Sequence, residues 1–167
     1  MTKWMIVLSL LIFSQQASLA QQIKPSSVDY PGFVSLSQQA QTHRQQRLVK
    51  LDHFLEMAQA PNTLILDTRS ADAYQRKHFK GAVHLNFSDF TTEKLAKVIP
   101  HKNTRILIYC NNNLDNDPQN FPTKMMPLAL NIPTFINLYG YGYQNIYELS
   151  ELIDIQDKRL LFAGTDI

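Results

Sequence analysis

Short, largely apolar runs recur along the chain, and longer segments separate them. Five such runs of four or five residues lie at 48–51, 63–66, 82–85, 105–109 and 145–149. Runs of this length favour buried strands of a parallel sheet. The run at 105–109 is the strongest of the five, and Cys110 follows it directly.

The segments between these runs predict helices. Spacing and capping residues indicate helices over 34–47, 52–60, 70–77, 88–98 and 123–139. Asp52 and Ser70 are the expected N-caps of the second and third helices, because their side chains can accept hydrogen bonds from backbone N–H groups. Pro127 lies in the first turn of the last helix, and Pro133 is expected to bend it. Residues 34–47 are polar, so a disordered tether is the alternative to a surface helix there.

Strands that alternate with helices predict an α/β fold, with a small parallel sheet flanked by helices on both faces. The chain has 167 residues, 44% of them apolar, which is enough for one such domain with a proper core. We place this domain at residues 48–155 and expect residues 156–167 to form a C-terminal tail.

The N-terminus has the pattern of a secretory signal peptide. A lysine precedes an apolar stretch at 4–13, and Ser18 and Ala20 are small residues at the two positions that a signal peptidase reads. The sequence therefore predicts a signal peptide at 1–20, followed by a linker and helical extension at 21–47. A retained membrane anchor is the alternative, but the apolar stretch is short for a bilayer. We expect an exported protein, periplasmic in a Gram-negative cell and secreted otherwise, with no membrane contact after signal removal.

Charge and histidine spacing exclude several kinds of partner. The net charge is +2, and no run of lysines and arginines resembles a nucleic-acid-binding arm. The five histidines do not have the spacing of metal ligands. The sequence therefore predicts no nucleic-acid partner, no metal and no cofactor.

Cys110 is the only cysteine, so an internal disulfide and a Cys-x-x-Cys pair are both impossible. It directly follows a strand, and ligands bind beyond the carboxyl ends of strands in open α/β sheets. Backbone N–H groups in the turn that follows can point at one anion and lower the pKa of a thiol. We expect these N–H groups to come from Asn111, Asn112, Asn113 and Leu114. The alternative is a buried, inert thiol that serves packing alone.

Four segments together resemble one protein family. They are the Asp-x-Arg at 67–69, the His-x-x-Gly-Ala segment at 78–85, the strand at 106–110 and the Gly-aromatic pattern at 142–149. Each resembles a segment of rhodanese-like (sulfurtransferase) domains, and they occur in that family's order over residues 48–152. Such a set is far more specific than any single motif. The chain is similar to an exported, single-domain branch of the family.

This resemblance implies a persulfide mechanism. Cys110 would take sulfur from a small sulfur-containing donor and pass it to a thiol or another nucleophilic acceptor. Asp67 and Arg69 match family positions that support the sheet and the loops, and a surface ion pair is the other interpretation. A protein is among the partners that the resemblance allows.

The segment after Cys110 departs from the family pattern. Residues 111–122 form a long loop without glycine or a basic residue, and they include Asp115 and Asp117. Two carboxylates near an anion site repel anionic donors, and Lys124 is the first cation that could reach the site. The departure weakens cyanide detoxification as the function, and the missing Cys-x5-Arg counts against phosphatase chemistry, which needs that arginine. A non-catalytic binding or sulfur-carrier module is therefore the alternative function.

Overall fold

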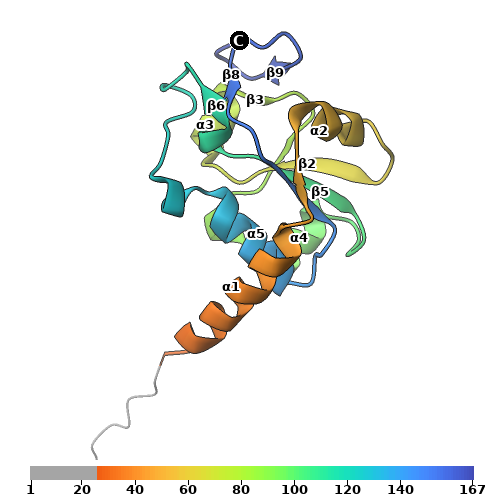
Figure 1. The fold of residues 1–167 in the computed structure, drawn as a ribbon, viewed down its shortest axis with the longest axis vertical. Coiled ribbons are helices and arrows are strands. Elements are labelled where there is room, and N and C mark those ends of the chain that lie inside the picture. The colour runs from red at the N-terminus through yellow and green to blue at the C-terminus, as the bar shows by residue number, and fades with distance from the viewer. Residues whose placement is uncertain (1–25) are drawn as a thin grey trace, which may run out of the picture.

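The computed structural model describes residues 26–167, so the expected signal peptide at 1–20 lies outside the described residues. The centre of the fold is a five-stranded parallel sheet with the order β1-β7-β5-β2-β4. Its strands are β1 (Leu48–Val49), β2 (Thr63–Asp67), β4 (Val83–His84), β5 (Arg105–Ile108) and β7 (Ile146–Leu149). Strands β2 and β5 lie side by side in Figure 1. The predicted parallel α/β fold is confirmed.

Strand β5 lies in the middle of the sheet, which explains why its run is apolar on both faces. Leu107 packs into the core cluster on one face, while Ile106 and Ile108 pack into the cluster on the other, because successive side chains of a strand point to opposite faces. The register places Ile108 beside both Leu66 and Glu148. The carboxyl ends of β2, β5 and β7 therefore meet at one edge of the sheet.

Helices cover both faces of the sheet. Apolar side chains of α2 (Leu51–Ala58) and α3 (Ala71–Arg76) pack on one face, and those of α1 (Tyr30–Arg44), α4 (Thr92–Val98) and α5 (Asn131–Gly140) pack on the other. The predicted cap of α3 is confirmed, since the Ser70 hydroxyl accepts a hydrogen bond from the backbone N–H of Ala73 at 3.2 Å. In the described part of the chain, no helix combines the length and the apolar character needed to span a membrane.

The last predicted helix begins later than expected. Residues 123–130 contain only a 3₁₀ turn, η3 (Met126–Leu128), and α5 begins at Asn131. Pro133 lies in the first turn of α5, where a proline costs the helix no hydrogen bond. The predicted start near residue 123 and the bend at Pro133 are therefore wrong, while the helix itself is confirmed over residues 131–139.

Other helix boundaries differ by a few residues. Lys50, not Asp52, is the N-cap residue of α2, and Asp52 lies in the first turn, where a negative charge suits the helix dipole. Helix α4 begins after a cap by Thr91, and a separate 3₁₀ turn, η1 (Phe87–Asp89), precedes it. Helix α1 confirms the predicted surface helix in place of a tether.

Two small strand pairs lie outside the main sheet. β3 (His78–Phe79) pairs antiparallel with β9 (Phe162–Ala163), and β6 (Leu114–Asp115) pairs in parallel with β8 (Ile153–Asp154). The C-terminal segment, expected to form a tail, therefore supplies a strand. It also supplies Leu160 to the core cluster that contains α2.

Candidate functional site

Cys110 lies at the carboxyl end of β5 and is the N-cap residue of a 3₁₀ turn, η2 (Asn111–Asn113). The residue is a free cysteine and is only 1% exposed. It forms part of the wall of a cavity of about 220 Å³, to which α1, β7, η3 and α5 also contribute. Cys110 therefore lies in the wall of a cavity at the edge of the sheet where strands β5 and β7 end.

Two opposing effects determine the ionisation of Cys110. Burial is the largest effect and raises the pKa of the thiol, because the thiolate loses its solvation. Hydrogen bonds from the backbone N–H groups of Asn131, Asn112 and Leu130 favour the thiolate and lower the pKa, while the charge of Glu148 raises it. The net direction is upward. The expectation that the site lowers the thiol pKa is therefore wrong.

The turn after Cys110 supplies only part of the expected set of N–H donors. The N–H group of Asn112 is directed at the sulfur. The N–H group of Asn113 faces the Cys110 side chain in a capping box and also donates to the carbonyl of Cys110 at 3.1 Å. The N–H group of Leu114 donates to the carbonyl of Asn111, and Asn111 itself lines a neighbouring cavity. Of the four residues named from the sequence, the structure thus brings the amides of Asn112 and Asn113 to the Cys110 side chain.

The other two N–H donors that act on Cys110 lie at the start of α5 and were not predicted from the sequence. The first N–H groups of a helix have no partner within the helix, and here Leu130 and Asn131 direct theirs at Cys110. If Pro133 had been taken to mark the first turn of the helix, the N–H groups of Leu130 and Asn131 would have been predicted to lie free at its start. Among the described residues, the buried Oδ1 of Asn131 has no hydrogen-bond partner, so an acceptor remains available beside the cavity.

The side chain of Asn113 fixes the shape of the turn. Its Oδ1 accepts hydrogen bonds from the backbone N–H of Cys110 at 2.9 Å and from Nδ2 of Asn131 at 3.0 Å. Its Nδ2 donates to the carbonyls of Leu149 at 2.9 Å and Glu151 at 3.0 Å. These bonds connect the end of β5 to the end of β7 and the start of α5, so this asparagine holds the three elements around the sulfur.

A carboxylate and a guanidinium also line the cavity. Glu148 on β7 is 5% exposed, and its Oε2 and Oε1 accept hydrogen bonds from Nε and Nη2 of Arg44 at 2.5 and 2.6 Å. From the sequence, Glu148 was expected in a strand and Arg44 in a surface helix, and neither was predicted to take part in the site. The available signal was an acidic residue within an otherwise apolar strand.

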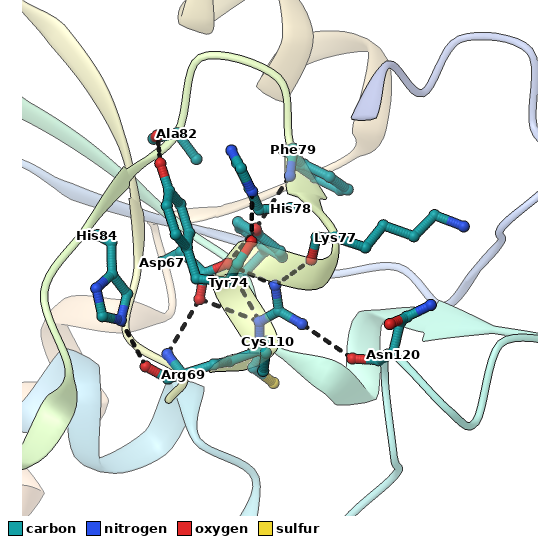
Figure 2. Close-up of polar contacts among 12 residues, drawn as sticks. Asp67, Arg69, Tyr74, Lys77, His78, Phe79, Ala82, His84, Cys110 and Asn120 are labelled. Atoms are coloured by element: carbon teal, nitrogen blue, oxygen red, sulfur yellow. Dashed lines mark hydrogen bonds and ion pairs between the residues drawn. The ribbon is translucent and has the colours of Figure 1, made fainter. Parts of the chain in front are cut away.

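Asp67 and Arg69 form a pair at the end of β2, the strand beside β5 (Figure 2). The two residues are 0% and 3% exposed. Nε and Nη2 of Arg69 donate to the carboxylate at 2.7–3.1 Å, and Nη1 donates to the carbonyl of Asn120 at 3.0 Å. The hydroxyl of Tyr109 donates to Asp67 at 2.5 Å. The two residues are therefore paired, but in the interior of the domain and not on its surface.

Two other charged residues named from the sequence lie away from the cavity of Cys110. Asp117 forms an ion pair with Nζ of Lys77 at 3.0 Å. Lys124 is exposed, and its backbone N–H and carbonyl bond to the side chain of Asn112 at 3.1 and 2.7 Å. Lys124 and Arg69 line the neighbouring cavity of about 390 Å³. Within residues 26–167, no group of three or more His, Cys, Asp or Glu side chains is placed to hold a metal ion.

The five-stranded parallel α/β sheet, with Cys110 after its central strand, is the arrangement expected of a rhodanese-type domain. The family model described as a rhodanese-like domain matches residues 50–151. The chain therefore belongs to the rhodanese-like domain family. No curated protein matches the sequence significantly.

Solved structures are similar to this chain at low sequence identity. A rhodanese with anions from Escherichia coli is 19% identical, with 62% of this chain and 99% of that chain covered and a TM-score of 0.41. A protein from Helicobacter pylori is 18% identical, with 74% and 94% covered and a TM-score of 0.47. The polysulfide-sulfur transferase homodimer from Wolinella succinogenes is 13% identical, with 75% and 91% covered and a TM-score of 0.43.

Proposed function

We propose that this chain is a sulfurtransferase that carries sulfane sulfur as a persulfide on Cys110. The observation that carries the proposal is the position of Cys110 in the wall of a cavity at the sheet edge, where the backbone N–H groups of Asn112, Leu130 and Asn131 act to lower the pKa of its thiol. Backbone N–H donors at such a position stabilise an anionic sulfur. Packing alone gives no reason for two elements to direct their amides at one thiol.

The chemistry requires two displacements at sulfur. The thiol of Cys110 loses its proton to solvent, and the thiolate attacks the outer sulfur of a donor such as thiosulfate. The new S–S bond forms as the S–S bond of the donor breaks, and sulfite leaves with the electron pair. An acceptor thiolate then attacks the terminal sulfur of the persulfide, so that Cys110 leaves as a thiolate and the acceptor becomes a persulfide.

Burial of Cys110 suits a thiol that works in an oxidising compartment. The thiolate is the form that oxidises and forms mixed disulfides. Because burial raises the thiol pKa, less thiolate is present at any given pH than for a solvent-exposed thiol. The persulfide is an anion, and the amides of Asn112, Leu130 and Asn131 are placed to stabilise it.

The test is the intact mass of the protein after incubation with thiosulfate, a thiosulfonate or polysulfide. Because the chain has a single cysteine, a gain of one sulfur atom that a reducing agent removes is assigned to Cys110. We expect Cys110→Ser to keep its circular dichroism spectrum and to gain no mass. A Ser variant that transferred sulfur as well as the native protein would refute the proposal.

A non-catalytic binding or sulfur-carrier module is the second candidate. It is favoured by the raised thiol pKa and by the described wall of the cavity, in which the one cation, Arg44, is already paired with a carboxylate. Absence of an adduct with every donor, together with poor alkylation at neutral pH, would favour the binding module. An adduct that no small acceptor removes would indicate a carrier.

We also propose that the protein acts after export, with a small sulfur-containing donor and a thiol or other nucleophilic acceptor. Three exposed apolar side chains of one segment, Met125, Met126 and Leu128, support an acceptor that is part of a protein. Met126 lines the cavity of Cys110, and exposed apolar patches are typical of protein contact sites.

A further inference from the structure

The cavity of Cys110 contains one pair of opposite charges. Among its described wall residues, the charged ones are Glu148 on β7 and Arg44 in the last turn of α1. Both carboxylate oxygens of Glu148 accept hydrogen bonds from the guanidinium, at 2.5 and 2.6 Å. The Glu148 side chain is 6% exposed and that of Arg44 is 35% exposed, so the arginine reaches a buried carboxylate from the solvent side.

A carboxylate without a partner at this position would oppose anionic chemistry at Cys110. A buried charge that lacks a partner is costly, and a second negative charge on the nearby sulfur adds repulsion. Apart from Arg44, the carboxylate of Glu148 receives one long hydrogen bond, from Nδ2 of Asn131 at 3.4 Å. Arg44 is therefore the group that balances the charge of Glu148.

We propose that Arg44 is a positioning residue for Cys110, which neutralises Glu148 so that the sulfur beside it can carry a negative charge. The role in the persulfide state rests on the proposed sulfurtransferase function. Arg44 precedes the region that matches the family, residues 50–151, so the inference makes α1 part of the active site. It also explains how a loop at 111–122 without a basic residue can serve an anionic sulfur.

The other charges near the site do not replace this pair. The remaining described wall residues come from β1, η2, η3, α5 and the end of β7 and are uncharged. Arg69 and Lys124 line the neighbouring cavity instead. Removal of the Arg44 charge should therefore leave Glu148 as the charged group that acts on the thiol.

The test is the pH dependence of Cys110 alkylation by iodoacetamide in the mature chain. We expect Arg44→Gln to alkylate roughly tenfold more slowly than the native protein at neutral pH, with its midpoint at a higher pH, because an unbalanced carboxylate disfavours the thiolate. Glu148→Gln should alkylate faster, with a lower midpoint. The double variant should return close to the native profile, because both charges are absent.

Two matched variants separate this role from a structural one. Arg47→Gln removes the same charge from a side chain that stacks on Tyr147 at 4.9 Å and does not contact Glu148, so its profile should be native. Arg44→Lys keeps the charge and should recover most of the native rate. A merely structural loss at Arg44 would loosen α1, expose the sulfur and speed alkylation.

The outcomes distinguish this inference from the proposed function. An unchanged or faster rate in Arg44→Gln, or a double variant that stays slow, would overturn the role of Arg44 even if the native protein takes up sulfur. If the alkylation series behaves as expected but no donor adds sulfur to the native protein, the sulfurtransferase proposal fails and Arg44 keeps only its effect on the thiol.

Discussion

At the scale of single residues, burial and hydrogen bonding act on Cys110 in opposite directions, and burial is the stronger effect. A raised pKa means less thiolate at any given pH. We therefore expect the alkylation rate of the native protein to reach its midpoint at a higher pH than that of the same chain unfolded in urea, where the thiol is solvated. Rates measured across the pH range check this. A native midpoint at or below the unfolded one would show that the amide donors outweigh burial.

Tyr109 connects the strand of Cys110 to the buried Asp67–Arg69 pair. Its hydroxyl donates to Asp67 and accepts a hydrogen bond from the backbone N–H of Phe79 at 3.1 Å. We expect Tyr109→Phe to lower the free energy of unfolding by about 1–3 kcal/mol, because it leaves a buried N–H without a partner. Urea denaturation measures the change. Tyr147→Phe on the adjacent strand is the control, and an equal loss in both variants would contradict this account.

Some residues of the site follow from the sequence, and others depend on contacts across the fold. Cys110 was predictable because it ends the strongest apolar run. Arg44 and Glu148 were not assigned to the site, because their contact joins positions 104 residues apart and a polar surface helix gives no sign of where it packs. The N–H donors at the start of α5 were not predicted, because the start of that helix was itself predicted too early. The true start depends on how the preceding segment crosses the site.

At the scale of elements, central strands were predicted more closely than edge strands. β2, β5 and β7 each begin or end within one residue of their apolar runs, whereas β1 and β4, at the two edges, shorten to two residues each. A central strand has neighbours on both sides and needs a continuous apolar run, while an edge strand pairs on one side only. The sequence did not predict the two-residue strands β3, β6, β8 and β9. Strands this short are recognised only by their pairing with segments far away in the sequence.

The C-terminal segment provides a test of packing at this scale. Leu160 is 7% exposed within a core cluster, whereas its neighbour Leu161 is 63% exposed. We expect Leu160→Ala to lower the free energy of unfolding by about 2–5 kcal/mol, because it leaves a cavity in the core. Leu161→Ala should change it by less than about 0.5 kcal/mol, as is usual for surface positions. Similar midpoints of urea denaturation for Leu160→Ala and Leu161→Ala would show that the C-terminal segment does not pack into the core.

At the scale of the whole molecule, segments on both sides of the family match at 50–151 complete the domain. Helix α1 packs beside α5 and β7 and provides the partner of Glu148. The C-terminal segment pairs β9 with β3 and contributes Leu160 to the core. The region that matches the family therefore supplies most of the sheet and Cys110. The N-terminal flanking segment adds the charge that balances Glu148, and the C-terminal one adds part of the hydrophobic core.

The proposed export concerns the whole molecule, because it would place the single buried thiol in an oxidising compartment. We expect the precursor, produced in a Gram-negative cell, to yield a periplasmic protein that begins at Gln21, because Ser18 and Ala20 are small residues at the positions that signal peptidase reads. N-terminal sequencing and intact mass of the periplasmic fraction check this. Ala20→Phe should block cleavage and keep the precursor with the membrane.

The same preparation tests whether burial protects Cys110 in an oxidising compartment. A thiol that is 1% exposed, with a pKa raised by burial, should stay unlinked, so the periplasmic protein should run as a monomer on a non-reducing gel. Unfolding in urea before air oxidation should produce the disulfide-linked dimer, since exposure then lets the thiolate form. An uncleaved protein in the cytoplasm would contradict export. A cross-linked periplasmic protein would show that the sulfur is more accessible than its place in the cavity wall implies.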